Sequence, residues 1–376
     1  MFNQRLTRKR ASYSGMIIQR GIFRELCINL LIVTFSISIL LFMERFVRLT
    51  GIIMWRGTDI KDIIRVFIYL QPSILTLSIP MALLISIFLT YGRMLSDNEI
   101  VILKNSGMSF LGISKAPLLL SLSCFIIMLS LSLYLSPKGM QSFKKTLYET
   151  IVRKALMVIE KESFSRVFKD TVIYINEMPA KGVFKGVFVY REDTGSKGLT
   201  RPVVITASDG EIISNPNEGL IKLILHNGMI HTVTRDGASE VSFSQYDFIL
   251  STGIEPRKRI KPTEIETIRL WQGRRDDPEW DVEFNRRFAI PFASIIFGIL
   301  GPPIAMRMGS IGRLGGLSFS LVILLLYYAI LIATEGLAKA ERLTVFMGEW
   351  IPNMVFLIIA LIAFLNSYSD RPVKRL

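Results

Sequence analysis

One short polar segment of this 376-residue chain has residue types and spacing that could do chemistry. It lies between two long apolar runs and extends from Gly92 to Gly107. Ser96-Asp97-Asn98-Glu99 has the spacing in which a hydroxyl group and a carboxylate cap the start of a helix. Gly107 suits the position just beyond the end of a helix. Residues 97–107 are therefore predicted to form a short helix.

Two roles for this helix remain open from the pattern alone. We expect Ile100, Ile102 and Leu103 to be exposed to whatever the helix packs against. Acidic residues at one end and apolar residues along the helix suit an element on which a partner protein docks. A helical linker in which Glu99 only caps the first turn fits the same pattern.

Other catalytic and ligand-binding patterns are missing from the sequence. It contains no G-x-x-x-x-G-K-[ST] phosphate loop, no H-E-x-x-H and no cysteine cluster, so we expect no enzyme, metal site or cofactor. The two histidines, His226 and His231, lack a third ligand at a sensible spacing and are interpreted as exposed strand and turn residues. The two cysteines, Cys27 and Cys124, fall inside apolar runs, which argues against a disulfide framework.

Long apolar runs dominate the rest of the chain, which is 50% hydrophobic and has a mean hydropathy of +0.42. About 18 helical residues cover about 27 Å, close to the thickness of the hydrocarbon core of a bilayer. Charged residues are almost absent from the runs, which argues against an ion channel, a proton-coupled pump or an intramembrane enzyme. We therefore predict six membrane-spanning helices, at Leu26–Met43, Val66–Tyr91, Phe110–Leu135, Phe288–Met306, Leu314–Thr334 and Ile351–Tyr368.

The net charge of +14 is carried by residues that flank the apolar runs, so it indicates membrane topology rather than nucleic-acid binding. Both basic ends are predicted to be cytoplasmic, as is the helix at 97–107. The first run is too long for a signal peptide and has no small-residue cleavage site after it, so we expect it to be retained. Residues 44–65 should lie outside the cytoplasm but carry an excess of basic side chains, which invites a functional explanation.

The predicted organisation places three spans on each side of one large insertion. Its parts are a cytoplasmic tail (1–21), spans one to three (22–135), an insertion (136–286), spans four to six (287–369) and a second cytoplasmic tail (370–376). We therefore predict a polytopic α-helical membrane protein with an inserted all-β domain.

The insertion changes hydrophobic period along its length. It begins with a predicted helix at Lys138–Glu160 and continues with short β-type runs. Asp209-Gly210, Asn227-Gly228 and Asp236-Gly237 separate these runs and are predicted to be hairpin turns of a sandwich, roll or barrel. Residues 251–262 are predicted to be a linker, and Thr263–Trp271 a short helix.

These features resemble the LptF/LptG family of lipopolysaccharide-export permeases. The resemblance rests on the second span, the Gly92-Arg93 junction, Ser96-Asp-Asn-Glu-Ile with Asn105-Ser-Gly107, and the layout of three spans, β domain and three spans. It extends from about Met16 to the C-terminus, and residues 1–15 lie outside it. Within the family the chain is more similar to the LptF branch.

The resemblance implies a Gram-negative inner-membrane protein with a jellyroll-like β domain in the periplasm. It implies a heterodimer with an LptG-like sister permease, a separate LptB-like ATPase dimer that binds ATP, and LptC-like and then LptA-like bridge proteins. It places ATPase coupling on Asp97, Asn98, Glu99, Ile100 and Leu103, with Glu99 at the position of the family's coupling glutamate. Such a permease extracts lipopolysaccharide from the outer leaflet and passes it towards the outer membrane.

The resemblance also gives the basic excess at 44–65 a meaning. Arg45 and Arg48 are three residues apart, so they share a face if the first span continues as a helix. They match basic family residues that bind the lipopolysaccharide head group, and guanidinium groups suit phosphates. Interfacial anchoring by arginines that reach towards water is the alternative.

Two other functions remain open from the sequence. The first is a permease of another ATP-driven lipid or lipoprotein exporter, which substrate co-purification would separate from lipopolysaccharide export. The second is a membrane-anchored scaffold or sensor without transport activity, which would not co-purify with an ATPase.

Overall fold

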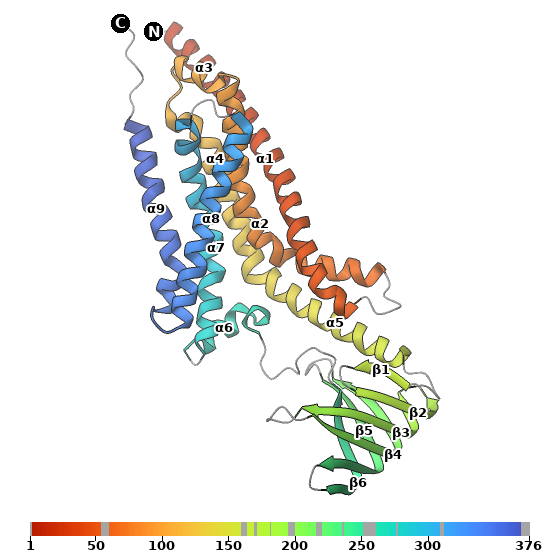
Figure 1. The fold of residues 1–376 in the computed structure, drawn as a ribbon. Coiled ribbons are helices and arrows are strands. Elements are labelled where there is room, and N and C mark those ends of the chain that lie inside the picture. Colours follow the sequence, from red (N-terminus) through yellow and green to blue (C-terminus); the bar gives the residue numbers. More distant parts are fainter. Residues whose placement is uncertain are drawn as a thin grey trace. The chain divides into compact units, whose positions relative to one another are not determined.

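A computed structural model describes most of the chain (Figure 1). The residues outside its description are 1, 54–59, 159–163, 169–170, 181, 195–199, 216–219, 235–236, 251–260, 276, 309–311 and 370–376. The helices are α1 (Phe2–Ile53), α2 (Ile60–Ser96), α3 (Glu99–Asn105), α4 (Phe110–Ser130), the π-helical turn η1 (Leu131–Leu135), α5 (Ser136–Val158), the 3-10 turn η2 (Pro262–Glu264), α6 (Thr267–Gly273), α7 (Pro278–Arg307), α8 (Gly312–Lys339) and α9 (Val345–Ser369). The strands are β1 (Phe164–Phe168), β2 (Thr171–Ala180), β3 (Val183–Thr194), β4 (Thr200–Asn215), β5 (Leu220–Thr234) and β6 (Gly237–Leu250).

Six helices among the described residues are long and apolar enough to cross a membrane, which confirms the six predicted spans. These helices extend beyond the apolar runs that predicted them. The third span, for example, continues through η1 into α5, where Pro137 lies in the first turn. Proline cannot donate the regular helical hydrogen bond, and the wider π-helical turn before it lets the chain continue as a helix.

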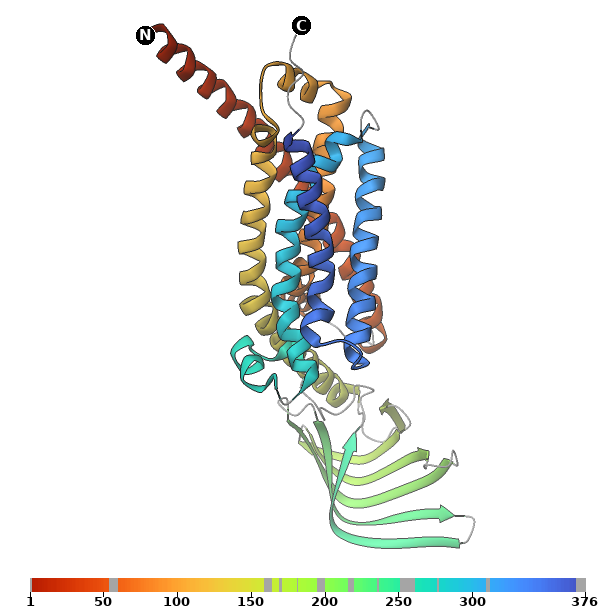
Figure 2. The ribbon, with the colours of Figure 1, turned by 90° about the vertical axis from the view of Figure 1, so that its left-hand side faces the viewer.

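Helix α7 lies at the centre of the helical bundle and packs against α4 and α9 (Figure 2). Gly298 of α7 approaches α4 so closely that a Cβ atom there would lie 2.2 Å from Ser121 Oγ. Association between membrane helices depends on such close approach at small residues, because the surrounding lipid is as apolar as the helices.

This contact gives a test of the packing. Gly298→Ala is expected to lower the stability of the bundle by about 1–3 kcal/mol, because the added methyl group overlaps Ser121. Thermal unfolding of the purified chain in detergent measures the change. Ser121→Gly in the same chain should restore most of the loss, and a double variant no more stable than Gly298→Ala alone would contradict this packing.

The six strands form one antiparallel sheet in the order β1-β2-β3-β4-β5-β6. This confirms the inserted β domain. The strand order is a meander, in which each strand pairs with its sequence neighbour. A jelly roll in the strict sense consists of Greek keys with crossing connections, so the domain resembles one in its curvature rather than its strand order.

The strands of the sheet bend along their length (Figure 2). One line of residues across the sheet, with one residue in each of the strands β2 to β6, interrupts the ladder of paired residues. These residues are Asn176, Gly186, Ser208, Asn227 and Ser244, and the register of the strands is the same on either side of them. The positions whose side chains pack in the core change from odd to even, or the reverse, across this line. In β5, for example, they are Leu223 and Leu225 before the line and Ile230 after it. The extra residue in each strand therefore keeps the apolar side chains on one face around the bend.

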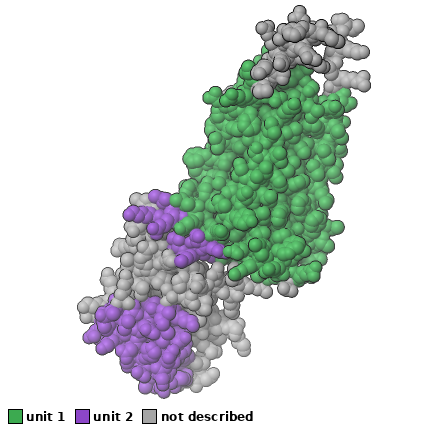
Figure 3. Space-filling view, turned by 180° about the vertical axis from the view of Figure 1, so that it is seen from behind, with its two compact units in different colours: residues 1–48, 67–140, 261–376 green, residues 49–66, 141–260 purple. Residues whose placement is uncertain are grey.

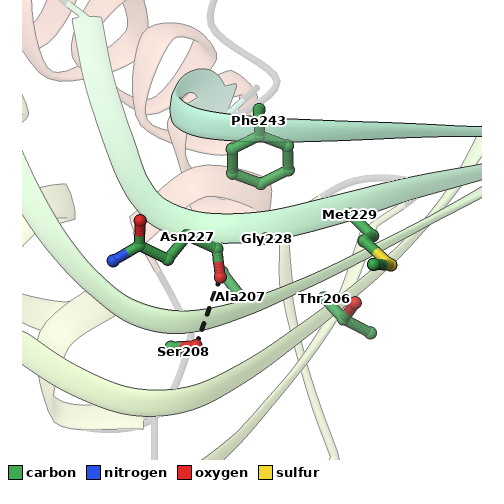
Figure 4. Close-up of a pocket in the computed structure, with 7 residues that line it drawn as sticks. All are labelled: Thr206, Ala207, Ser208, Asn227, Gly228, Met229 and Phe243. Carbon is green, nitrogen blue, oxygen red and sulfur yellow. Dashed lines mark hydrogen bonds between the residues drawn. The ribbon is translucent and has the colours of Figure 1, made fainter.

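Two of the three predicted hairpins are wrong for this reason. Asp209-Gly210 and Asn227-Gly228 lie inside β4 and β5. Of the third predicted turn, Asp236 lies outside the described residues, and Gly237 pairs with Thr234 where β5 ends and β6 begins. Asn227 has a φ of +50°, which allows a bend within the strand instead of a turn between strands. Figure 4 shows that bend, where the Phe243 ring lies by Gly228 and Ser208 Oγ donates to Asn227 O at 3.2 Å.

The chain divides into two compact units, coloured in Figure 3. One contains residues 1–48, 67–140 and 261–376, and the other contains residues 49–66 and 141–260. Residues 261–286 were predicted to belong to the insertion but fall in the helical unit. Buried Arg287 explains this, because its guanidinium donates to Thr267 Oγ1 and to the carbonyl of Pro262 and so attaches η2 and α6 to α7.

Candidate functional site: a charged cluster beside a short helix

The short helix α3 ends as the sequence predicts. Gly107 has a φ of +88°, a conformation that glycine adopts without steric cost. The amide of Gly107 donates to Lys104 O at 3.0 Å, and that of Met108 donates to Leu103 O at 3.1 Å. These two hydrogen bonds form a Schellman motif, which satisfies carbonyl groups at the end of the helix.

The start of α3 differs from the predicted capping box. Ser96 belongs to the last turn of α2, where its hydroxyl donates to Gly92 O, and the N-cap of α3 is Asn98 in a left-handed conformation. No side chain caps the first turn. Glu99 instead binds the guanidinium group of Arg93, a charge-assisted interaction that is stronger than a bond to a neutral amide.

Arg93 is the centre of a cluster that connects α1, α2 and α3. Its Nε and Nη2 atoms each donate to one carboxylate oxygen of Glu25 at 2.6 Å, in a bidentate pair. Its Nη1 atom donates to Glu99 Oε1 at 2.6 Å and to Asp97 Oδ2 at 3.0 Å. One guanidinium group thus holds the first span, the second span and the short helix together at the end of the bundle.

The cluster has more negative than positive charge. One cation faces the three carboxylates of Glu25, Asp97 and Glu99, which leaves two negative charges in excess. The side chain of Glu99 is 42% exposed and that of Asp97 is 53% exposed, whereas Glu25 is 28% exposed. The two outer carboxylates can therefore bind a basic group of another molecule without leaving Arg93.

The apolar residues of α3 divide between two faces. Ile100 and Leu103 are buried in the helical core, so the prediction that they are exposed is wrong. Both pack inward because they lie three residues apart on one face of the helix. Ile102 is 63% exposed, and Val101 is also exposed.

A groove of about 390 Å³ lies beside this cluster. Its lining residues come from α1, α2 and α3 and are Ile18, Gly21, Ile22, Glu25, Arg93, Met94, Glu99, Ile102 and Leu103. Apolar side chains and the ion-paired Glu25, Arg93 and Glu99 both line the groove, which suits a protein segment with both apolar and basic side chains.

Arg93 was noted in the sequence only as part of the family resemblance, and its pairing with Glu25 was not predicted. A signal was present, because each is a charged residue at the edge of an apolar run and the two have opposite signs. The contact joins residues 68 positions apart, which no local pattern reports.

The two predicted substrate-binding arginines lie on one helix, since α1 continues to Ile53. Arg45 is partly buried, and the side chain of Arg48 is outside the described part of the chain. Their role in binding phosphate stays a prediction.

The described residues contain no group of three or more histidine, cysteine or acidic side chains that could hold a metal ion. His231 Nδ1 lies 3.0 Å from Glu240 Oε1 on the neighbouring strand. Cys27 and Cys124 are free thiols.

Known proteins resemble the chain over nearly its whole length. Residues 20–366 match the model of a family described as lipopolysaccharide export system permease LptF/LptG. The lipopolysaccharide export system permease proteins LptF of Escherichia coli K12 and of Shigella flexneri are each 21% identical over 364 residues. The alignment covers 96% of this chain and 97% of each relative.

Proposed function

The chain belongs to the LptF/LptG family of lipopolysaccharide export system permeases, and we propose that it is one permease subunit of an ATP-driven complex that extracts lipopolysaccharide from the outer leaflet of the inner membrane. The observation that carries the proposal is the family match over residues 20–366, which covers the sheet and all but a few terminal residues of the six spans. The 21% identity to LptF proteins supports an LptF-like role within this proposal.

In this proposal the energy comes from a separate ATPase dimer, and the chain holds no cofactor of its own. The sequence contains no phosphate loop that could bind ATP. The ATPase docks on α3, where a basic side chain binds Glu99 and Asp97 and an apolar side chain contacts Ile102. ATP-driven closure then moves α3, and the Arg93 pairs transmit the movement to α1 and α2.

The substrate follows an apolar route. A sister permease completes a cavity with this chain, and lipopolysaccharide enters from the outer leaflet with its phosphates near Arg45 and Arg48. When the cavity closes, the acyl chains move to the apolar face of the sheet, whose buried residues include Ile175, Val189 and Leu223. Periplasmic bridge proteins then receive the lipid. Both termini lie in the cytoplasm in this arrangement.

Reconstitution tests the proposal. The chain is purified together with the proteins that accompany it in detergent and is placed in liposomes that contain lipopolysaccharide. The expected result is an LptB-like ATPase and a second permease in the preparation, with ATP-dependent transfer of lipopolysaccharide to added bridge protein. A chain that purifies without an ATPase would favour a scaffold, and transfer of a lipoprotein instead would favour another exporter.

The head-group contact gives a further prediction. Arg45→Gln should weaken lipopolysaccharide binding roughly tenfold, because a charge-assisted contact to phosphate is lost. Binding of labelled lipopolysaccharide to the purified complex measures the change. Lys61→Gln is the matched control, since it removes an exposed charge from the same basic segment of the chain. Equal loss in both variants would indicate a nonspecific effect of charge and contradict a dedicated contact.

A further inference from the structure

A second charged pocket lies at the opposite end of α7 from its last residue, Arg307. It has a volume of about 510 Å³ and is formed by three segments of the helical unit. The turn between α6 and α7 contributes two arginines, the first turns of α7 contribute polar groups, and the start of α9 contributes an apolar wall. Its lining residues are Arg274, Arg275, Pro278, Asp281, Asn285, Val345 and Phe346.

The two arginines have guanidinium N–H groups that are available to donate hydrogen bonds to a ligand. The guanidinium of Arg274 lies 3.6 Å from the centre of the Trp271 ring and 5.6 Å from that of Phe284. Stacking on an aromatic face fixes a guanidinium group but leaves the N–H groups at its edge available. Among the described residues, neither Arg274 nor Arg275 has an ion-pair partner or a side-chain hydrogen bond. Two such groups at one pocket fit the oxygens of a phosphate.

The pocket is surrounded by aromatic residues at the ends of two spans. Trp271 and Phe284 have ring centres 5.2 Å apart, and Phe346 stacks on Trp350 at 5.7 Å. The candidate spans Pro278–Arg307 and Val345–Ser369 both begin here. Tryptophan and other aromatic side chains collect at the depth of lipid head groups, so we expect the pocket at the depth where a phospholipid presents its phosphate.

One carboxylate in the pocket indicates which kind of head group fits. Asp281 Oδ1 accepts a hydrogen bond from Asn285 Nδ2 at 3.1 Å. Its second oxygen has no partner among the described residues. The pocket therefore combines two cations with one available carboxylate oxygen, which complements a head group that carries both a phosphate and a cation.

We propose that this pocket binds a zwitterionic phospholipid with a primary ammonium group, of the phosphatidylethanolamine type. The phosphate binds Arg274 and Arg275, the ammonium group binds Asp281, and an acyl chain lies along Val345 and Phe346. The lipid is a bound component of the surrounding bilayer. The site does not depend on the proposed export function.

Native mass spectrometry of the purified full-length chain in neutral detergent tests this site. Short-chain phosphatidylethanolamine, phosphatidylglycerol, lipopolysaccharide and inorganic phosphate are titrated separately. We expect one phosphatidylethanolamine to bind in preference to phosphatidylglycerol, and its apparent affinity to fall about tenfold in Arg274→Gln or Arg275→Gln. Asp281→Asn should remove the preference for phosphatidylethanolamine while phosphatidylglycerol still binds.

Arg269→Gln is the matched control, because Arg269 is an exposed arginine of α6 outside the pocket. A loss of affinity in this control equal to that in Arg274→Gln would overturn the site. Displacement of the lipid by equimolar inorganic phosphate would overturn its assignment to a lipid. Binding of lipopolysaccharide alone at these arginines would show that the pocket belongs to the substrate route and would also overturn the proposal.

Discussion

Glu99→Lys is expected to abolish coupling between ATP hydrolysis and lipopolysaccharide export while the chain stays folded. The Glu99 side chain is 42% exposed, and Arg93 keeps its bidentate pair with Glu25 when Glu99 is replaced. The new lysine would repel both Arg93 and a basic side chain of a docked ATPase. Loss of a charge pair of this kind typically costs about 2 kcal/mol or more, so we expect ATP-driven release to fall at least roughly tenfold.

The measurement compares ATPase activity with lipopolysaccharide release from liposomes for the purified complex. Glu266→Lys is the control, since it makes the same change of charge at another exposed glutamate, the N-cap residue of α6. Unchanged release in Glu99→Lys would remove α3 from the coupling route. Equal losses in both variants would mean that added positive charge, rather than its place, impairs the complex.

Arg93→Gln is expected to have the second large effect, on stability as well as coupling. Without the guanidinium group, Glu25 and Glu99 lose their shared cation at the end of two spans. Removing one partner of a fully buried pair costs roughly 3–5 kcal/mol. Arg93 and Glu25 are 22% and 28% exposed, so solvent screening reduces our expectation to roughly 2 kcal/mol.

A double variant separates the two effects. Glu25→Gln together with Arg93→Gln removes the uncompensated carboxylate as well, so the thermal stability in detergent should recover most of the loss seen in Arg93→Gln. Export should not recover, because α3 remains detached from α1 and α2. If the double variant is as unstable as Arg93→Gln, or if it exports normally, the cluster does not work as described.

The sequence predicted those parts of the structure that depend on local composition. The six spans follow from apolar runs that only a helix can carry through lipid, and the end of α3 follows from the steric freedom of Gly107. Both properties belong to a few neighbouring residues. Neither needs knowledge of what packs against them.

The parts that the sequence did not predict depend on distant contacts. The pairing of Glu99 with Arg93 replaced the expected capping box, because a guanidinium group from α2 binds Glu99 more strongly than backbone amides do. Asn227-Gly228 lies inside β5 instead of forming a turn, because the neighbouring strands β4 and β6 stay paired with β5 on both sides of the bend. Ile100 and Leu103 are buried because the bundle covers one face of α3.

A cross-link from Ile102 tests most directly whether a motor protein holds this chain at α3. A photo-reactive amino acid replaces Ile102, which is 63% exposed beside the cluster, and irradiation of intact cells precedes identification of the product. Our account predicts a covalent product with a cytoplasmic ATPase, and none from the same group placed at exposed Ile268 of α6. A product with the ATPase at position 268 but not at 102, or with a periplasmic protein at 102, would contradict it.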